Sequence, residues 1–190
     1  QNEKKSKNRK IEFIFYPAQL WYHKNHLTLL KAFRTISLKQ KNLQLILCGS
    51  KKNNYLNILN YIKLNNLQKR VKYLGNISQK KLEHYYKNCL LVVLPSLYES
   101  SSLVALEAIK MKKPVVCSNI SPMLELKNKF KLIYFKSNSS NSLVKSLVFA
   151  IKNKKKLKNY CRYNYENLND LSWQKNTLVL QKEILKLTKN

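Results

Sequence analysis

Glycine, acidic residues and long apolar runs are all scarce in this chain, and each scarcity excludes a class of protein. The 190 residues include two glycines, Gly49 and Gly75, so neither a G-x-G-x-x-G dinucleotide fingerprint nor a G-x-x-x-x-G-K-[ST] phosphate loop occurs. No apolar run approaches the ~18 residues that a membrane-spanning helix needs. Residues 1–10 are polar, which predicts a charged lead segment or linker and not a signal peptide.

The cysteines also follow no pattern typical of a metal or redox site. The sequence has four cysteines and three histidines, with no C-x-x-C pair and no metal-ligand spacing between the two kinds of residue. Three of the cysteines lie in or beside apolar, strand-like runs. We therefore expect reduced core residues of a cytoplasmic protein, and no metal site. The four are Cys48, Cys89, Cys117 and Cys161.

The shortage of acidic residues leaves an extreme positive charge. Against 37 Lys and Arg stand 9 Asp and Glu, which gives a formal net charge of +28. Such a charge raises nucleic acid and anionic membranes as partners. Lysine is scattered along every segment, however, and no zinc-finger, RNP or helix-turn-helix pattern occurs, which disfavours nucleic acid. Peripheral contact with the inner face of an anionic membrane is a further alternative, because each lysine near the surface contributes about 1 kcal/mol to the free energy of membrane binding.

From residue 11 onward, continuous apolar runs alternate with segments of helical periodicity. Continuous apolar strands are typical of a parallel sheet that helices cover on both faces. We therefore predict one Rossmann-like α/β domain over residues 11–190, in which the loops after the strands converge at the carboxyl ends and ligands bind there. Strands are expected at 11–16, 43–48, 71–74, 90–94, 115–117 and 132–135, and helices at 26–38, 55–64, 103–111, 143–151, 157–165, 173–187 and after Ser78.

Two carboxylates, Glu99 and Glu107, stand eight positions apart around a loop of small residues, Ser100–Ser102. The stretch from Leu103 is apolar nearly all round, which predicts a buried helix in which Glu107 needs a partner. A helix N-terminus after a small-residue loop can bind phosphate, and the two carboxylates would lie about 7–8 Å apart along the axis. A nucleotide sugar fits that arrangement. A buried Glu107 paired with lysine, beside an exposed Glu99, fits the spacing equally well.

The segment that carries these carboxylates resembles a family signature. Residues 95–108 read P-S-L-Y-E-S-S-S-L-V-A-L-E-A, which is similar to the E-x7-E motif of retaining glycosyltransferases of family 4. Three further segments match in the same order. They are Y-P-A-Q-L-W-Y-H-K-N-H at 16–26, P-V-V-C-S-N-I-S at 114–121 followed by Glu125, and L-S-W at 171–173. The resemblance covers about 11–187.

This resemblance implies the C-terminal, donor-binding half of a GT-B fold. Such a domain would take part in transfer of a hexose from a nucleotide-diphosphate sugar to a glycan or lipid-linked acceptor, as in polysaccharide synthesis. The resemblance implies retention at the anomeric carbon and no metal or other cofactor. It also implies an N-terminal acceptor domain that these residues do not include, so the chain is expected to be a fragment or half of a split enzyme.

The resemblance also assigns roles to individual residues. Lys24 would meet the donor diphosphate, Glu99 would hold the sugar, and Glu107 would bind the ribose hydroxyls. Backbone amides after the loop would stabilise the leaving phosphate, and residues at strand ends would lie near the nucleotide. The further donor-binding candidates are Gln19, Gly49, Gly75, Ser101, Ser102 and Leu103.

Departures from the family pattern leave two rival functions open. Serines replace the usual E-G-F-G glycines, and a serine at positive φ would cost about 1 kcal/mol. Lys112 stands where a glycine usually ends the helix. Gln19 replaces an arginine of many members. One rival is a non-catalytic nucleotide-sugar-binding domain, and the other is a basic module for membranes or nucleic acid.

Overall fold

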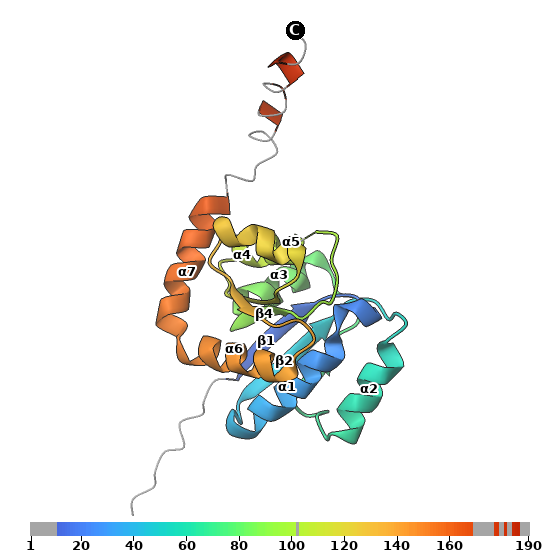
Figure 1. Cartoon of the computed structure of the whole chain (residues 1–190). Coiled ribbons are helices and arrows are strands. Elements are labelled where there is room, and N and C mark those ends of the chain that lie inside the picture. Colours follow the sequence, from blue (N-terminus) through green and yellow to red (C-terminus); the bar gives the residue numbers. More distant parts are fainter. Residues whose placement is uncertain (1–10, 102, 169–176, 179–180, 182–183, 187–190) are drawn as a thin grey trace, which may run out of the picture.

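A six-stranded parallel sheet forms the centre of the molecule (Figure 1). The computed structural model describes residues 11–101, 103–168, 177–178, 181 and 184–186. Every strand pairing in the described part is parallel, and the strand order is β3-β2-β1-β4-β5-β6. This confirms the Rossmann-like α/β prediction. The strands are β1 (Glu12–Pro17), β2 (Leu43–Cys48), β3 (Val71–Tyr73), β4 (Leu91–Leu94), β5 (Val115–Ser118) and β6 (Ile133–Phe135).

Helices cover both faces of this sheet. Helix α1 packs against α2 and α6 on one face, while α3, α4 and α5 gather on the other (Figure 1). Helix α7 lies beside the sheet and contacts α4 from one layer of helices and α6 from the other. The helices are α1 (His26–Lys39), α2 (Tyr55–Leu64), α3 (Gln79–Asn88), α4 (Leu103–Lys110), α5 (Ser121–Leu124), α6 (Ser140–Lys152) and α7 (Lys154–Asn167), with 3₁₀ turns η1 (Tyr22–Lys24) and η2 (Glu125–Asn128).

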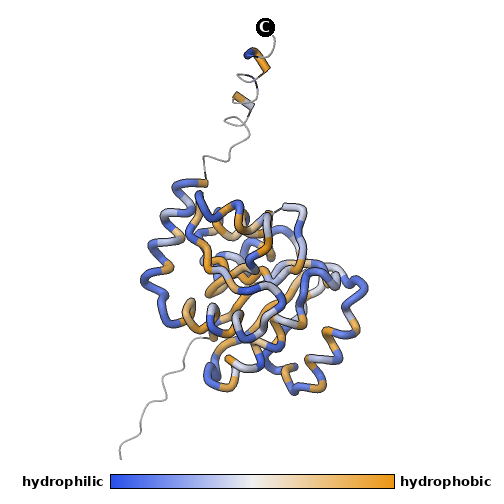
Figure 2. Tube along the Cα trace, viewed as in Figure 1, coloured by the Kyte–Doolittle hydropathy of each residue, from blue (hydrophilic) through white to orange (hydrophobic). Residues whose placement is uncertain are grey.

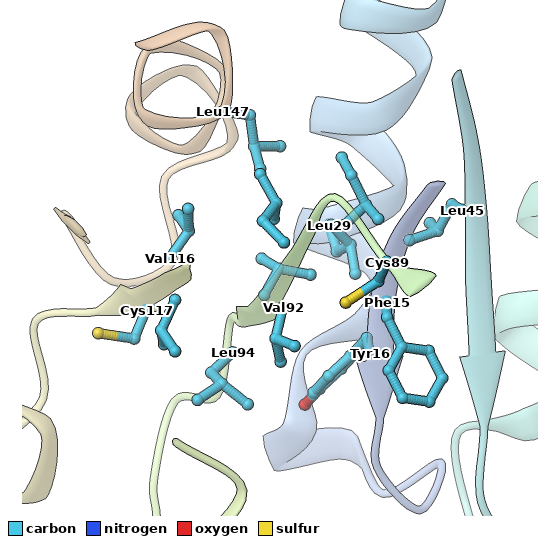
Figure 3. Packing of buried hydrophobic residues seen from close by; sticks show 14 of the residues in the cluster. Phe15, Tyr16, Leu29, Leu45, Cys89, Val92, Leu94, Val116, Cys117 and Leu147 are labelled. Carbon is cyan, nitrogen blue, oxygen red and sulfur yellow. The ribbon is translucent and has the colours of Figure 1, made fainter. Parts of the chain in front are cut away.

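The core is built from the continuous apolar runs that predicted strands. All residues of β4 and β5 are buried. The apolar segments therefore lie inside the molecule, and hydrophilic segments lie outside (Figure 2). Leu29 of α1 and Leu147 of α6 are fully buried and reach toward the strands around Val92 (Figure 3).

The four cysteines belong to this core, as expected. All are buried and free of disulfide bonds. Burial raises the pKa of Cys48, Cys89 and Cys117 to about 12, and that of Cys161 to about 11. The thiols therefore stay protonated at neutral pH, which suits a packing role.

Differences from the predicted elements are small. Helix α7 begins at Lys154, three residues before the apolar periodicity does, because lysine is a good helix former. A short helix, α5, carries Pro122 in its first turn where only a turn was expected. The described residues of the predicted helix 173–187 are helical. Ser172, which the sequence predicts as the cap of this helix, lies outside the described residues, as do Trp173 and the lead segment 1–10. Among the described helices, none has the length and apolar character needed to cross a bilayer.

Gly49 and Gly75 follow β2 and β3, and both have positive φ, at 135° and 65°. The two positions differ in the space around them. A Cβ on Gly49 would lie 2.4 Å from the carbonyl oxygen of Ala18, in the loop after β1, whereas a Cβ on Gly75 would meet nothing within 4 Å. Gly49 thus lets two neighbouring strand ends approach each other.

We expect Gly49→Ala to lower the free energy of unfolding by about 3 kcal/mol or more. The backbone of Ala18 must move away from the new methyl group, and a residue with a side chain must adopt the strained positive φ of position 49. Gly75→Ala should cost only about 1 kcal/mol, the conformational part alone. Chemical denaturation of both variants measures the difference. Equal losses would show that the close approach to Ala18 costs nothing.

Candidate functional site

The loops after the strands meet at the carboxyl edge of the sheet, as the sequence predicted. The loop after β1 (residues 18–25) is held by the loops that follow β2 and β4, and the loop after β2 is held by that after β3. The backbone hydrogen bonds that join them are Ala18 N to Cys48 O (2.9 Å), Leu20 N to Ser50 O (3.0 Å), Gly49 N to Gly75 O (2.9 Å) and Leu97 N to His23 O (2.8 Å).

At this edge Lys24 and Glu99 form an ion pair. Lys24 Nζ lies 2.7 Å from each carboxylate oxygen of Glu99, although the two residues are 75 positions apart. Their side chains are 19% and 14% exposed, so the pair is largely shielded from water. A lysine ammonium has three N–H donors and a carboxylate has about four acceptor positions. Both groups can therefore bind a ligand while they remain paired.

Buried hydroxyl groups fix the position of this pair. Ser96, fully buried, donates a hydrogen bond of 2.6 Å from its Oγ to Glu99 Oε1. Ser118 Oγ in turn donates to the carbonyl of Ser96 at 2.6 Å. The Tyr16 hydroxyl donates to the carbonyl of Lys24 at 2.8 Å and lies 3.4 Å from Ser96 Oγ. Burial raises the pKa of Tyr16 far above its ordinary value, so the phenol stays protonated and able to donate.

Sequence reasoning missed Tyr16, Ser96 and Asn25 as parts of the site. The available signal was membership of the matched segments, because Ser96 stands in the segment 95–108 and Tyr16 and Asn25 stand in the segment 16–26. Asn25 has a left-handed backbone with φ of 53°, and its side-chain amide donates to the carbonyl of Pro95 at 3.1 Å. Asparagine tolerates this conformation better than most residues, so it can link the loops after β1 and β4.

The expected burial of Glu107 is wrong. Helix α4 has an exposed face that carries Leu103, Glu107 and Lys110, which are spaced one turn apart. Leu103 is 65% exposed, although the sequence around it is apolar. Glu107 has a partner, but a neutral one: the buried Tyr86 hydroxyl of α3 donates to its Oε2 at 2.7 Å. Burial and the Glu107 charge raise the pKa of Tyr86, which keeps this donor protonated.

Two cavities flank the loop after β1. One, of about 390 Å³, contains Lys24 and Val104 of α4 in its wall. The other, of about 280 Å³, has Gly49 in its wall, and Gln19 takes part in both. Gln19 accepts a hydrogen bond of 2.8 Å from the Trp21 indole. The first cavity is lined by Pro17, Ala18, Gln19, Trp21, His23, Lys24 and Val104, and the second by Pro17, Ala18, Gln19, Cys48, Gly49, Asn76, Ile77 and Leu82.

The remaining predicted residues lie around the start of α4. Ser101 is exposed, Ser102 lies outside the described residues, and Leu103 begins the helix. Neither Ser101 nor Leu103 lines the two cavities. The non-glycine residues with positive φ in the described part are Asn25, Asn66, Lys112 and Asn138. Backbone strain therefore falls at Lys112, where the family has glycine, and not at Ser100 or Ser101.

Fold and site together define a parallel α/β protein with a paired lysine and carboxylate at the carboxyl ends of its strands. The family model described as glycosyl transferases group 1 matches residues 1–167. The chain therefore belongs to the group 1 glycosyltransferases. An uncharacterized glycosyltransferase of Methanocaldococcus jannaschii is 33% identical over 116 residues, which are 60% of this chain and 29% of that protein.

Solved structures show the same fold. Sucrose-phosphate synthase of Thermosynechococcus elongatus has a TM-score of 0.80 at 22% identity, over 94% of this chain and 46% of that one. Anabaena HepE, solved with UDP and glucose, has a TM-score of 0.76 at 19% identity, over 95% and 49%. The C-terminal domain of a group 1 protein of Francisella tularensis has a TM-score of 0.76 at 18% identity, over 85% and 86%. The chain thus spans about half of the first two structures.

Helix α1 begins at His26, as the sequence predicted. His26 is fully buried, its ring lies 4.7 Å from that of Tyr16, and neither ring nitrogen has a hydrogen-bond partner in the described part of the chain. Burial lowers the pKa of His26 from 6.5 to about 3, and the nearby Ala18 carbonyl offsets only part of that effect. The imidazole is therefore neutral in the folded protein at neutral pH.

Because the folded pKa of His26 lies below its unfolded value, its neutral form stabilises the fold above about pH 6.5, and acid removes this contribution. We expect the free energy of unfolding to fall by roughly 2 kcal/mol between pH 7 and pH 5. Urea denaturation across this range should show a much smaller slope for His26→Phe than for wild type. His84→Phe, at an exposed position, is the matched control and should keep the wild-type slope. An unchanged slope in His26→Phe would contradict a buried neutral imidazole.

Proposed function

We propose that this chain is the donor-binding domain of a retaining glycosyltransferase. It binds a nucleotide-diphosphate sugar, whose hexose passes to a glycan or lipid-linked acceptor of the polysaccharide or lipopolysaccharide type. We place it in the cytoplasm, at the inner face of the membrane. The observation that carries the proposal is the Lys24–Glu99 pair at the carboxyl edge of the sheet in a member of the group 1 glycosyltransferases.

In this proposal the pair handles the reacting end of the donor. Lys24 keeps one N–H donor free for a diphosphate oxygen, so its charge stabilises the leaving phosphate as the glycosidic bond breaks. Glu99 accepts from Lys24 on both oxygens and from Ser96 on Oε1, which leaves about one lone pair, on Oε2, to accept a hydrogen bond from a sugar hydroxyl. Ser96, already bonded to Glu99 Oε1, keeps the carboxylate oriented toward the sugar. The cavity beside Lys24 supplies room for these groups.

The nucleoside end of the donor is assigned to neighbouring residues. Glu107 points from the exposed face of α4 and would accept from the ribose hydroxyls, while Tyr86 holds its other oxygen. The amides of Ser101, Ser102 and Leu103 would add hydrogen bonds to phosphate at the positive end of the helix dipole. Gln19, Gly49 and Gly75 line or adjoin the cavities where the base would lie. The UDP and glucose bound by Anabaena HepE support this ligand class.

The acceptor belongs to a separate part of the enzyme in this proposal. This chain spans 46% of the sucrose-phosphate synthase structure and 49% of the HepE structure, so a second domain would supply the acceptor surface. We also propose that transfer needs no metal or other cofactor. Lys24 would provide the positive charge that a metal provides in other phosphate-transfer sites.

Calorimetric titration of this chain with UDP, GDP and ADP tests the donor site. One nucleotide should bind in preference to the others, equally well with EDTA and with Mg²⁺. Glu107→Ala should weaken that binding about tenfold, the effect of losing a hydrogen bond to a charged group. Glu83→Ala, a carboxylate on α3, is the control and should bind as wild type does. If a folded sample bound none of the three nucleotides, the nucleotide assignment would be wrong. If Glu107→Ala bound the nucleotide as tightly as wild type does, the ribose assignment would be wrong.

Lys24→Gln tests whether the lysine meets phosphate. It should lower affinity for the preferred nucleoside diphosphate by about 10- to 100-fold, and affinity for the corresponding nucleoside by less than about threefold. Lys31→Gln, an exposed lysine of α1, controls for lost net charge. Equal losses for diphosphate and nucleoside would mean that Lys24 acts only by holding the loop after β1.

A further inference from the structure

A larger cavity lies at the amino ends of the strands, opposite the carboxyl ends that carry the candidate donor site. Its volume is about 610 Å³, within the range of about 300–1,000 Å³ typical of small-molecule sites. Leu90 and Pro114, the residues directly before β4 and β5, form part of its wall. The cavity is therefore at the amino ends of these strands, and α7 provides one side of it.

Helix α7 presents two parallel stripes of side chains to this cavity. Leu157 and Cys161, one turn apart, are 3% and 6% exposed and form an apolar floor with Leu90 and Pro114. Lys154, Lys158 and Arg162 follow the same spacing but are exposed. Side chains four residues apart lie on one helix face, so the cations form a row beside the apolar floor. Helix α7 is hydrophilic for most of its length (Figure 2).

Positive charge around this cavity is only partly balanced. Lys154 pairs with Glu12, Lys113 donates to the Cys89 carbonyl at 3.1 Å, and Lys112 Nζ lies 4.1 Å from the centre of the Tyr165 ring. No ion pair in the described part involves Lys158 or Arg162. The wall carries five cations and one carboxylate, Glu166: the cations are Lys112, Lys113, Lys154, Lys158 and Arg162. Cations so close repel one another, and a bound anion would relieve that repulsion.

We propose that this cavity binds an anionic phospholipid and docks this face of the protein on an anionic membrane. An acyl chain lies on the apolar floor, and the phosphate lies between Lys158 and Arg162, whose guanidinium matches phosphate geometry. The apolar wall favours lipid over nucleic acid. Tyr165 is its single aromatic residue, whereas single-stranded nucleic acid is held by several stacking platforms. The candidate donor site at the other edge of the sheet stays accessible.

Vesicle sedimentation with the full chain tests the charged part of the site. The protein should bind phosphatidylcholine vesicles that contain phosphatidylglycerol, and not phosphatidylcholine alone. Lys158→Glu combined with Arg162→Glu should lower the partition coefficient by about 30-fold or more, because each basic residue near an anionic surface contributes severalfold. Lys63→Glu combined with Lys69→Glu makes the same change in net charge on exposed lysines at and after α2 and should change binding less than about threefold. Equal losses in both variants would show diffuse attraction and overturn the site.

Backbone amide NMR tests the apolar part. Monomeric decyl phosphate should shift amides of Leu157, Cys161 and Lys113, whereas inorganic phosphate and decyl maltoside at the same concentration should not. A response to inorganic phosphate alone would overturn the lipid assignment in favour of a free anion. An absent response to decyl phosphate would overturn the cavity as an acyl site.

Three further controls separate this proposal from its rivals and from the donor site. A dimer on gel filtration that the Lys158→Glu, Arg162→Glu variant abolishes would assign the face to a second copy of the chain. Oligonucleotide binding lost in the same variant, without a decyl phosphate response, would assign it to nucleic acid. The variant should bind nucleotides as wild type does, so failure of the lipid site leaves the donor proposal standing.

Discussion

The loop after β1 is the constraint on which the carboxyl edge of this sheet depends. It lies between the loops after β2 and β4, and backbone hydrogen bonds hold it on both sides. Its fit against the β2 loop requires a position without a side chain, Gly49. Because this loop is fixed, Lys24 reaches Glu99, and the two cavities form on either side of it. Both cavities of the candidate site thus follow from one short segment.

Polar groups in this region are held by neighbours that are themselves buried. Ser96, Ser118 and Tyr16 lie at the ends of three adjacent strands, and their hydroxyls bond to the pair or to the backbone around it. A shielded ion pair is costly unless its geometry is fixed and its remaining lone pairs are satisfied. The serine–carboxylate bond meets part of that requirement and, with the two bonds from Lys24, leaves about one lone pair of Glu99 for a ligand. His26 differs from this pair because burial lowers its pKa, so its ring is buried in the neutral form and needs no charged partner.

The positive charge of the chain acts differently at the two edges of the sheet. At the carboxyl ends of the strands Lys24 is paired with Glu99, and Lys52 lies over the ring of Trp21. At the amino ends of the strands five cations line an apolar cavity; Glu166 is the carboxylate in its wall, and Glu12, outside the wall, pairs with Lys154. Scattered lysines in the sequence thus become a local concentration of charge once α7 packs beside α4 and α6. A donor at one edge and a membrane at the other would leave both ligands accessible together.

The sequence determined the strands, most helix limits and the location of the E-x7-E segment, because apolar periodicity and caps are local properties of the chain. It also predicted that the strand-end loops meet, since parallel strands share one carboxyl edge. Only the tertiary structure decided that Lys24 pairs with Glu99 across 75 positions and that Tyr86 bonds to Glu107. Periodicity likewise predicted a buried α4, yet one of its faces is exposed. Burial depends on which elements pack against a helix, and local sequence does not specify those neighbours.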